Sequence, residues 1–300
     1  MSFASSPLRW AAVSLCTFLS MAALAAPPAD TLTRIRQTRT VTLGTREAAR
    51  PFSFLNADKQ PVGYSVDLCL RAVEALKREL KMPDLKVNFV TVSGAERIPK
   101  LVDGSIDMEC GSTTNTRARQ EQVDFSYTIF VAGMKILTTD AEISGDTTTL
   151  AGKKVALSQG TTSEKLFNQM RDNGMQLTVY PSNGDALKAL QDGKAVAFPQ
   201  DDVLLQGMLS TMQDTKRYRL VPKYLSVEPY AIMVRKGDKA LLTVIDRALV
   251  QAYSSGEINA VYARWFETAG LKVPMSTLTR DSISRPTKEP AFALILGYTM

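Results

Sequence analysis

The segment Glu109–Arg119 (ECGSTTNTRAR) gathers residue types that suit the binding of a small carboxylate. It follows the strand-like run 106–109 and places the hydroxyls of Ser112 and Thr114 before a short predicted helix. Backbone N–H groups at a helix N-terminus favour anions, and the guanidinium of Arg119 can grip a carboxylate through two parallel hydrogen bonds. The segment therefore predicts a pocket that binds a small anion and need not react with it.

Further side chains that can bind charged groups stand at predicted loops and helix starts. Arg46 follows the first predicted strand, and Arg97 lies early in a short helix. Taken singly, each has a simpler explanation, because exposed arginines are usually solvated, and Thr162 and either Asp201 or Asp202 are natural helix caps. A site is favoured because all of them fall at the same end of the predicted α/β units.

The residue types that are missing exclude several classes of enzyme. The chain has no histidine, which removes histidine-based triads and the common zinc sites. It has no Walker A, Gly-x-Ser-x-Gly or Gly-x-Gly-x-x-Gly motif. No metal and no cofactor are expected, and an enzyme would depend on acids such as Glu47 or Glu109. The net charge of +6 is scattered without a basic run, so no nucleic-acid partner is expected.

The N-terminus has the pattern of an export signal. Arg9 precedes a mainly apolar run that ends in the small-x-small pattern Ala23-Leu24-Ala25. We therefore expect residues 1–26 to be a signal peptide. The alternative is a single membrane anchor, although the apolar run is short for a span of about 20 residues.

Two cysteines, Cys69 and Cys110, remain after such a signal peptide is removed. In an oxidising exported compartment this pair is a candidate disulfide. The alternative is two small buried side chains that never meet, because the sequence does not supply the distance between them.

The elements that must position the candidate residues alternate between strand-like and helix-like runs. In the first unit we predict strands at 41–44, 52–55, 62–64 and 87–92, and helices at 65–81, with Ser65 as its cap, and 95–102. In the second we predict strands at 154–157, 177–180 and 195–198, and helices that begin at 160, 185 and 201. A strand at 230–234 and two helices near 239–254 and 258–266 follow.

This order predicts an α/β protein of two lobes, each a mostly parallel sheet flanked by helices. The last two helices are expected to return to the first lobe, because the second unit already looks complete. The chain would then cross between lobes near 131–134 and 229–232, with a hinge and a cleft. The expected domains are lobe 1 (27–131 plus 232–268), lobe 2 (132–231) and a disordered tail (269–300) with an unexplained apolar patch at 291–296.

Eight short motifs along residues 32–266 resemble one known family. In order they are RE before PFS (46–53), GYSVD (63–67), ERIP (96–99), ECGSTTN (109–115), SQGTTSE (158–164), NGD (183–185), DDVLL (201–205) and SGE (255–257). The chain is thereby similar to the periplasmic glutamate/aspartate-binding proteins of amino-acid ABC transporters, in solute-binding protein family 3. The resemblance implies the two-lobed type II periplasmic-binding-protein fold, a glutamate or aspartate ligand and a membrane ABC permease as partner. We expect a periplasmic monomer.

The resemblance also implies how an amino-acid head group would be bound. Arg119 and Thr114 would hold the α-carboxylate, and Thr162 would close on it from the second lobe. Asp201 would accept the α-ammonium, with help from Ser112. An amino-acid zwitterion needs one anion grip and one cation grip, and a dry cleft requires that every charge be paired.

The side chain of the ligand would be read by other residues. The resemblance assigns its carboxylate to Arg46 and Arg97, and two extra arginines are hard to explain for a neutral ligand. Two positions near this end depart from the family pattern, which often has a histidine at Asn183 and a serine at Gly94. Because Asn183 carries no charge, it would weaken the preference for a dianionic ligand.

Two other classes of protein compete with a binding protein. The first is an enzyme on the same scaffold, of the cyclohexadienyl (prephenate or arogenate) dehydratase type, with Glu109 or Glu47 as its acid. The second is a sensor ectodomain, against which the lack of a second membrane span or a fused signalling region argues.

Overall fold

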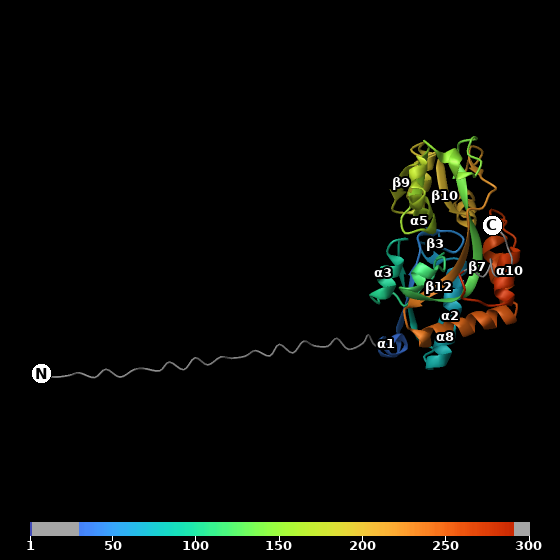
Figure 1. Cartoon of the computed structure of the whole chain (residues 1–300). Coiled ribbons are helices and arrows are strands. Elements are labelled where there is room, and N and C mark those ends of the chain that lie inside the picture. Colours follow the sequence, from blue (N-terminus) through green and yellow to red (C-terminus); the bar gives the residue numbers. More distant parts are fainter. Residues whose placement is uncertain (2–29, 291–300) are drawn as a thin grey trace.

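The structure is a computed structural model that describes Met1 and residues 30–290 (Figure 1). The predicted signal peptide, apart from Met1, and the apolar patch 291–296 lie outside the described residues. Within the described part of the chain, no helix is both long and apolar enough to cross a bilayer.

One mixed sheet runs through the molecule. Its main strands are β1 (Thr40–Thr45), β5 (Lys86–Thr91), β6 (Met108–Glu109), β7 (Val123–Thr138), β8 (Lys154–Ser158), β9 (Gln176–Tyr180), β10 (Ala197–Asp201) and β12 (Ser226–Arg235). They lie in the order β5-β1-β6-β12-β7-β10-β8-β9, and β11 (Arg219–Leu220) adds to β7. A small separate sheet holds β2 (Ala48–Ala49), β3 (Ser53–Leu55) and β4 (Pro61–Val62).

The two ends of the sheet are parallel, as expected from the α/β pattern. At one end β1 pairs in parallel with β5 and β6, and at the other β8 pairs in parallel with β9 and β10. The first end carries α1 (Thr31–Thr38), α2 (Tyr64–Leu80), α3 (Arg97–Val102) and α4 (Arg117–Gln120). The second carries α5 (Thr162–Gln169), α6 (Asn183–Gln191), α7 (Asp202–Leu209) and the short 3-10 turns η1 (Thr147–Leu150) and η2 (Arg171–Asn173).

Helix α2 shows how local sequence sets an element and where the prediction of its start was wrong. Its apolar residues at helical spacing, including Leu68 and Leu76, are buried against the core. The helix begins at Tyr64, and Ser65 is its buried second residue rather than its cap. The chain enters through Gly63 at φ 136°, where an added Cβ would lie 2.3 Å from the carbonyl oxygen of Phe52. Only glycine fits there, so the helix starts directly after it.

The centre of the sheet is antiparallel and joins its two ends. β7 and β12 pair from Ser226 opposite Met134 to Arg235 opposite Val123, with a register shift around Ala231. Figure 1 shows both strands running from the upper part of the molecule, with β9, β10 and α5, into the lower part, with α2 and α8. The two predicted crossings at 131–134 and 229–232 therefore fall inside two long strands. The two-lobed α/β architecture is confirmed.

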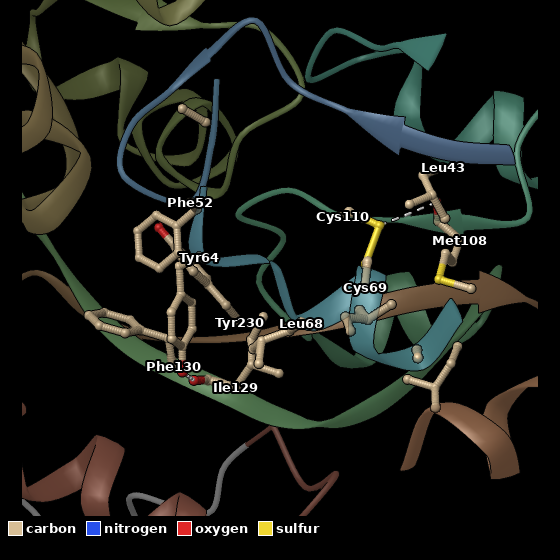
Figure 2. Packing of buried hydrophobic residues seen from close by; sticks show 14 of the residues in the cluster. Leu43, Phe52, Tyr64, Leu68, Cys69, Met108, Cys110, Ile129, Phe130 and Tyr230 are labelled. Carbon is tan, nitrogen blue, oxygen red and sulfur yellow. Dashed lines mark hydrogen bonds between the residues drawn. A yellow bond between two sulfur atoms is a disulfide. The ribbon is translucent and has the colours of Figure 1, made fainter. Parts of the chain in front are cut away.

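An aromatic cluster fixes the two crossing strands to the first end of the sheet. Phe52, Tyr64, Phe130 and Tyr230 gather in the core shown in Figure 2. Phe130 stacks on Phe266, with ring centroids 5.0 Å apart. Phe266 ends α9 (Glu257–Phe266), which follows α8 (Lys239–Ser254). The two helices after β12 therefore return to the first lobe, as the sequence predicts.

Cys69 and Cys110 form a disulfide, with their Cα atoms 6.1 Å apart (Figure 2). Cys69 belongs to α2, and Cys110 directly follows β6 at the start of the segment that the sequence singles out. The bridge thus ties that segment to the main helix of the first lobe.

The expectation that residues 269–300 are disordered is wrong for the part that the structure describes. Residues 277–284 form α10 (Thr277–Ser284), which packs on β7. The polar composition misled because Thr279 and Ser282 are fully buried with their hydroxyls hydrogen-bonded. Small hydroxyl side chains can enter a core when the backbone supplies their partners.

Candidate ligand-binding site

The eight candidate residues line one small cavity, of about 10 Å³. Its lining comprises Arg46, Arg97, Ser112, Thr114, Arg119, Thr161, Thr162, Asn183, Gln200, Asp201 and Leu204. The first five belong to the first lobe, and the others to the second. The carboxyl ends of β1, β8 and β10 all point at this space, because their last residues lie next to Arg46, the 158–162 loop and α7. The tertiary fold therefore brings every predicted site residue together.

Two buried arginines occupy the first-lobe wall. Arg46 follows β1, and its backbone N–H donates to the Ser53 hydroxyl at 2.8 Å. Arg97 begins α3 and is 3% exposed. Burial, with the neighbouring charge of Arg97 second, lowers the pKa of Arg46 to about 10. Burial also lowers the pKa of Arg97. Burial thus disfavours the charged form of both guanidiniums, which a negative group in the cavity would favour.

Glu109 lies behind these arginines as a partial counter-charge. Its Oε2 accepts from the Thr113 hydroxyl at 2.8 Å, and that hydroxyl accepts from Arg97 Nη1 at 2.8 Å. An added Cβ at Gly111 would lie 2.1 Å from Glu109 Oε1, so this position has room only for glycine. Glu109 is fully buried in this network, while Glu47 is exposed and does not line the cavity. Neither is placed as a catalytic acid that faces a substrate.

The Glu109–Arg119 segment forms a loop that leads into the short helix α4. Thr116 caps the short α4, and Ser112 and Thr114 lie in the loop before it. Both hydroxyl residues thus stand ahead of a helix N-terminus, as expected, and line the cavity, while the anion pocket stays a prediction. The loop is held by β12, because Thr114 forms a bridge with Tyr230 and the Ala231 N–H donates to the Thr113 carbonyl at 3.1 Å.

Arg119 spans the space between the lobes. Its Nη1 donates to the Thr114 carbonyl at 2.9 Å, and its Nη2 donates to the Gly160 carbonyl at 3.0 Å. Burial, followed by the nearby charge of Arg97, lowers the pKa of Arg119 to about 9. Arg97 Nη2 donates to the same Gly160 carbonyl at 2.9 Å. One carbonyl of the second lobe thus holds two cations of the first.

The second-lobe wall supplies hydroxyl and carboxylate groups. Thr161, not Thr162, caps α5 by accepting from the Glu164 N–H at 3.1 Å. The Thr162 hydroxyl donates instead to Glu228 Oε2 at 2.9 Å. The simpler explanation of Thr162 as a helix cap is therefore wrong, and its side chain lines the cavity with its hydroxyl bonded to Glu228.

Asp201 and Asp202 have different tasks. Asp202 is satisfied by the N–H groups of Gly133 and Val203 and by the Tyr224 hydroxyl. Asp201 occupies the cap position of α7 but makes no capping bond. Its Oδ2 accepts from the Tyr230 hydroxyl. Within the described residues its buried Oδ1 has no partner. Burial, followed by the charge of Glu228, raises the pKa of Asp201 well above its usual range. A cationic group of a ligand would favour the charged carboxylate and lower this pKa.

Asn183 lines the cavity and is hydrogen-bonded to Gln200, which also lines it. It begins α6, after the cap Ser182, and its Oδ1 accepts from Gln200 Nε2 at 2.9 Å. Gln200 Oε1 in turn accepts from the Asp201 N–H at 2.9 Å. Asn183 is therefore a neutral, hydrogen-bonded wall residue. Gly94 is outside the lining but close to it, since an added Cβ would lie 3.7 Å from Arg46 Nη2.

Sequence reasoning missed several residues of this site. Glu228 on β12 is 3% exposed and joins the second-lobe loop through Thr162. Tyr230 holds Asp201, and the backbone carbonyl of Gly160 receives the two arginines. A carbonyl has no sequence signature. The residues around Glu228 in the sequence indicate only a buried strand. Its place in the site becomes visible only when β12 is paired with β7.

Together these groups can bind a small zwitterion with an additional negative charge. Three guanidiniums face the cavity, and one carboxylate with an unpartnered oxygen stands across from them. Among the described residues, no group of three acidic, cysteine or histidine side chains could hold a metal ion.

Comparison with known proteins agrees with this geometry. Residues 41–268 match the model of the bacterial extracellular solute-binding proteins, family 3. The chain is 40% identical to an L-glutamate/L-aspartate-binding protein of Pseudomonas aeruginosa, over 95% of this chain and 99% of that protein. It is 37% identical to a glutamate/aspartate import solute-binding protein of Escherichia coli K12, over 85% and 86%.

The fold is likewise that of known binding proteins. The structure of a cysteine-binding protein from Campylobacter jejuni superposes with a TM-score of 0.72 at 25% identity, and covers 82% of this chain and 96% of that one. The curated relatives are transport proteins rather than enzymes. With the family model matched across both lobes and the cavity between them, the chain belongs to the bacterial extracellular solute-binding proteins of family 3.

Proposed function

We propose that this protein captures glutamate or aspartate outside the cytoplasm and delivers it to an ABC permease. The observation that carries the proposal is the charge arrangement of one interlobe cavity: Arg46, Arg97 and Arg119 on one wall and Asp201 on the other. A neutral amino acid would leave two buried guanidiniums without an anion, at a large cost in desolvation. The names of the relatives from Pseudomonas aeruginosa and Escherichia coli support the same ligand class.

The α-amino-acid head group is assigned to residues that have hydrogen-bonding capacity at the lobe interface. Arg119 and Thr114 bind the α-carboxylate, and Thr162 closes on it. Asp201 accepts the α-ammonium through its unpartnered Oδ1, with Ser112 beside it. The support for this assignment is that burial and the Glu228 charge disfavour the Asp201 carboxylate until a cation neutralises it.

The side-chain carboxylate of the ligand is assigned to Arg46 and Arg97. Both are buried and share only Glu109 behind them as a nearby carboxylate. Asn183, engaged with Gln200, completes this end as a neutral donor or acceptor. Because Asn183 carries no charge, we expect the affinities for glutamate and glutamine to differ less than they would with a cationic residue at this position.

The two lobes close on the ligand about β7 and β12. Lobe 1 is assigned to residues 27–131 plus 232–268, and lobe 2 to 132–231, since the boundaries then fall inside the two crossing strands. The α10 segment packs on β7 and so joins lobe 1. The protein is proposed to be a periplasmic monomer, exported by residues 1–26, that presents its closed form to a membrane permease and binds no nucleic acid.

The dehydratase alternative loses its candidate acids. Glu109 is buried behind the arginines with its Oε2 bonded to Thr113 and does not line the cavity, and Glu47 is exposed outside it. No observation in the site favours turnover of a bound substrate.

A thermal-shift screen of the twenty amino acids tests the proposal. A ligand that binds only the folded state stabilises it by about 2.7 kcal/mol at a concentration near 100 times its Kd. Glutamate and aspartate should raise the Tm by several degrees, and neutral amino acids by less. The proposal fails if neither acidic amino acid shifts the Tm.

Calorimetry then separates binding from catalysis. Glutamate should be recovered unchanged after titration, with a stoichiometry near one per chain. Conversion of the ligand by the purified protein would favour the enzyme instead.

A further inference from the structure

The described C-terminal residues make a continuous set of contacts with the functional part of lobe 1. They lie beyond residue 268, where the match to the family model ends. Residues 277–289, the C-terminal strap, run from the crossing region of β7 to the loop that carries Thr114 and the helix α4 that carries Arg119.

The strap first binds β7 at the predicted hinge. The Val131 N–H donates to the Thr279 hydroxyl at 3.1 Å. The same hydroxyl donates to the Val131 carbonyl at 3.4 Å. Thr279 is fully buried. Its backbone carbonyl accepts from the Ser282 hydroxyl at 2.8 Å, which keeps the short helix closed on the strand.

The strap next replaces a missing strand partner. The Thr287 carbonyl accepts from the Thr128 N–H at 3.0 Å and from the Thr128 hydroxyl at 3.3 Å. Thr128 lies where the pairing of β7 with β12 shifts its register, opposite Ala231. An irregular strand at this point has a free N–H to satisfy, and the strap satisfies it.

The last contact reaches the ligand loop. The Lys288 carbonyl accepts from Asn115 Nδ2 at 2.9 Å and from Gln120 Nε2 at 3.2 Å. The same Gln120 Nε2 donates to Asn115 Oδ1 at 2.8 Å. Asn115 is 1% exposed, and its N–H donates to the Pro229 carbonyl at 2.7 Å. The loop is thus held by β12 on its backbone side and by the strap on its side-chain side.

Charged contacts fasten the end of the strap to two helices. Lys288 pairs with Asp246 of α8, and its ammonium lies 5.1 Å from the centre of the Tyr127 ring. Glu289 pairs with Arg117 of α4 at 3.2 Å. The ion pair with Asp246 therefore anchors Lys288 to α8, an element outside the loop.

We propose that the C-terminal strap positions the carboxylate-binding loop, with Asn115 and Gln120 as the positioning residues that read the Lys288 carbonyl. Thr114 precedes Asn115 directly, and Arg119 precedes Gln120 directly, so each positioning residue is next to one that lines the ligand cavity. Without the strap, the amides of Asn115 and Gln120 turn to water and the loop samples other conformations. The ligand then has to order the loop on binding, which weakens its affinity.

The test is a double-mutant cycle that joins strap removal to Asn115→Ala, measured as glutamate affinity. This readout depends on the proposed function. Ending the chain at Pro274 and Asn115→Ala should each weaken binding about 10-fold, the loss expected for a buried hydrogen-bond network of this size. Combined, they should weaken it no further than the larger single effect, because they remove the same interaction. Fully additive effects, or unchanged affinity after truncation, overturn the proposal.

Two controls isolate the strap. A chain that ends at Pro290 keeps the strap and should bind like the full chain. Gln122→Ala, at an exposed position next to α4, should also retain wild-type affinity. Equal losses in these controls would show a general effect of altering the region and would overturn the proposal.

A second measurement needs neither ligand nor truncation. Backbone amide exchange of the unliganded protein should be slow at Thr128 and Asn115, and Asn115→Ala should speed exchange across 113–120 while Thr128 stays protected by Thr287. If the wild-type protein binds no amino acid, the proposed function fails but this exchange pattern still decides on the strap. Unchanged exchange in 113–120 would overturn the positioning role.

Discussion

At the scale of single residues, the site is defined by buried charges whose partners are neutral carbonyl and hydroxyl groups. Arg46, Arg97 and Arg119 all have lowered pKa values because of burial, and Asp201 has a raised one for the same reason. Perturbed groups of both signs around one cavity are typical of a functional site. A zwitterionic acid bound as proposed would reduce this cost.

Arg97→Ala is predicted to change specificity more than it changes amino-acid binding as such. A charge-assisted hydrogen bond contributes roughly 1.5–3 kcal/mol, so glutamate affinity should fall by about 10- to 100-fold while glutamine affinity changes little. Arg119→Ala should abolish binding of both, because it removes the common α-carboxylate grip. Calorimetry with glutamate, aspartate and glutamine makes the comparison. Glutamate affinity within a factor of two of wild type in Arg97→Ala would contradict the assignment.

Asp201→Asn is predicted to stabilise the unliganded protein while it removes ligand binding. The folded-state pKa of Asp201 is raised above its ordinary value of 3.8. As pH rises past that ordinary value, the unfolded chain loses this proton first, so the carboxyl group destabilises the fold increasingly until the folded-state pKa is passed. The variant's Tm should therefore exceed that of wild type by about 2 °C or more near pH 7 and approach it near pH 4.

Scanning calorimetry at both pH values decides this prediction. Asp192→Asn is the matched control, because Asp192 is an exposed second-lobe aspartate with a lowered pKa, from its bond to Lys188. It should keep the wild-type Tm near pH 7. A stabilisation of Asp201→Asn that is larger at pH 4 than at pH 7 would show the opposite linkage.

At the scale of elements, the ligand loop depends on what surrounds it. The loop 112–116 is tied to α2 through the Cys69–Cys110 disulfide just before it, to β12 by the Thr114 bridge and to the Lys288 carbonyl by the side-chain amide of Asn115. None of these supports comes from the loop itself. This explains why a segment without regular structure can present Ser112 and Thr114 at fixed positions.

Removing the disulfide is predicted to cost stability and some affinity. The bridge joins residues 41 positions apart. A cross-link of that length contributes about 2–4 kcal/mol, largely through the unfolded chain. The Cys69→Ser/Cys110→Ser variant should therefore melt several degrees lower and bind glutamate more weakly. Wild-type protein with and without reductant gives the same comparison. Equal melting temperatures in all samples would contradict the prediction.

At the scale of the whole molecule, function depends on the relative position of two lobes. Arg97 and Arg119 of the first lobe both donate to the Gly160 carbonyl of the second, so the structure has the lobes in contact at the site. β7 and β12 are the continuous connections between them. Their register shift near Ala231 gives a point where two paired strands can bend.

Lobe closure should be visible as compaction. On addition of glutamate the radius of gyration from small-angle scattering is expected to fall, because ligand bonds from both lobes hold the cleft shut. Arg119→Ala provides the control and should show no change with glutamate. A wild-type radius that is the same with and without saturating ligand would contradict closure as the capture mechanism.

Much of the fold was predictable from local patterns. The apolar face of α2, the α/β alternation in both lobes and the return of α8 and α9 follow from hydrophobic spacing and from one unit being complete. The full length of β7 and the helix α10 with its buried hydroxyl side chains were not predicted. Both depend on partners distant in the sequence, namely β12 for the strand and Val131 for Thr279.

The sequence by itself indicated eight of the side chains that line the cavity, because residues that follow the carboxyl ends of parallel strands gather at one edge of a sheet. All eight candidates accordingly line one cavity. Only the tertiary structure decided their tasks. It made Thr161 the cap and bonded Thr162 to Glu228 instead. It satisfied Asp202, left Asp201 with an oxygen that has no partner among the described residues, and brought in the Gly160 carbonyl. The reason is physical: residue type sets what a group can bind, but burial and neighbours from other elements set whether it is already bound.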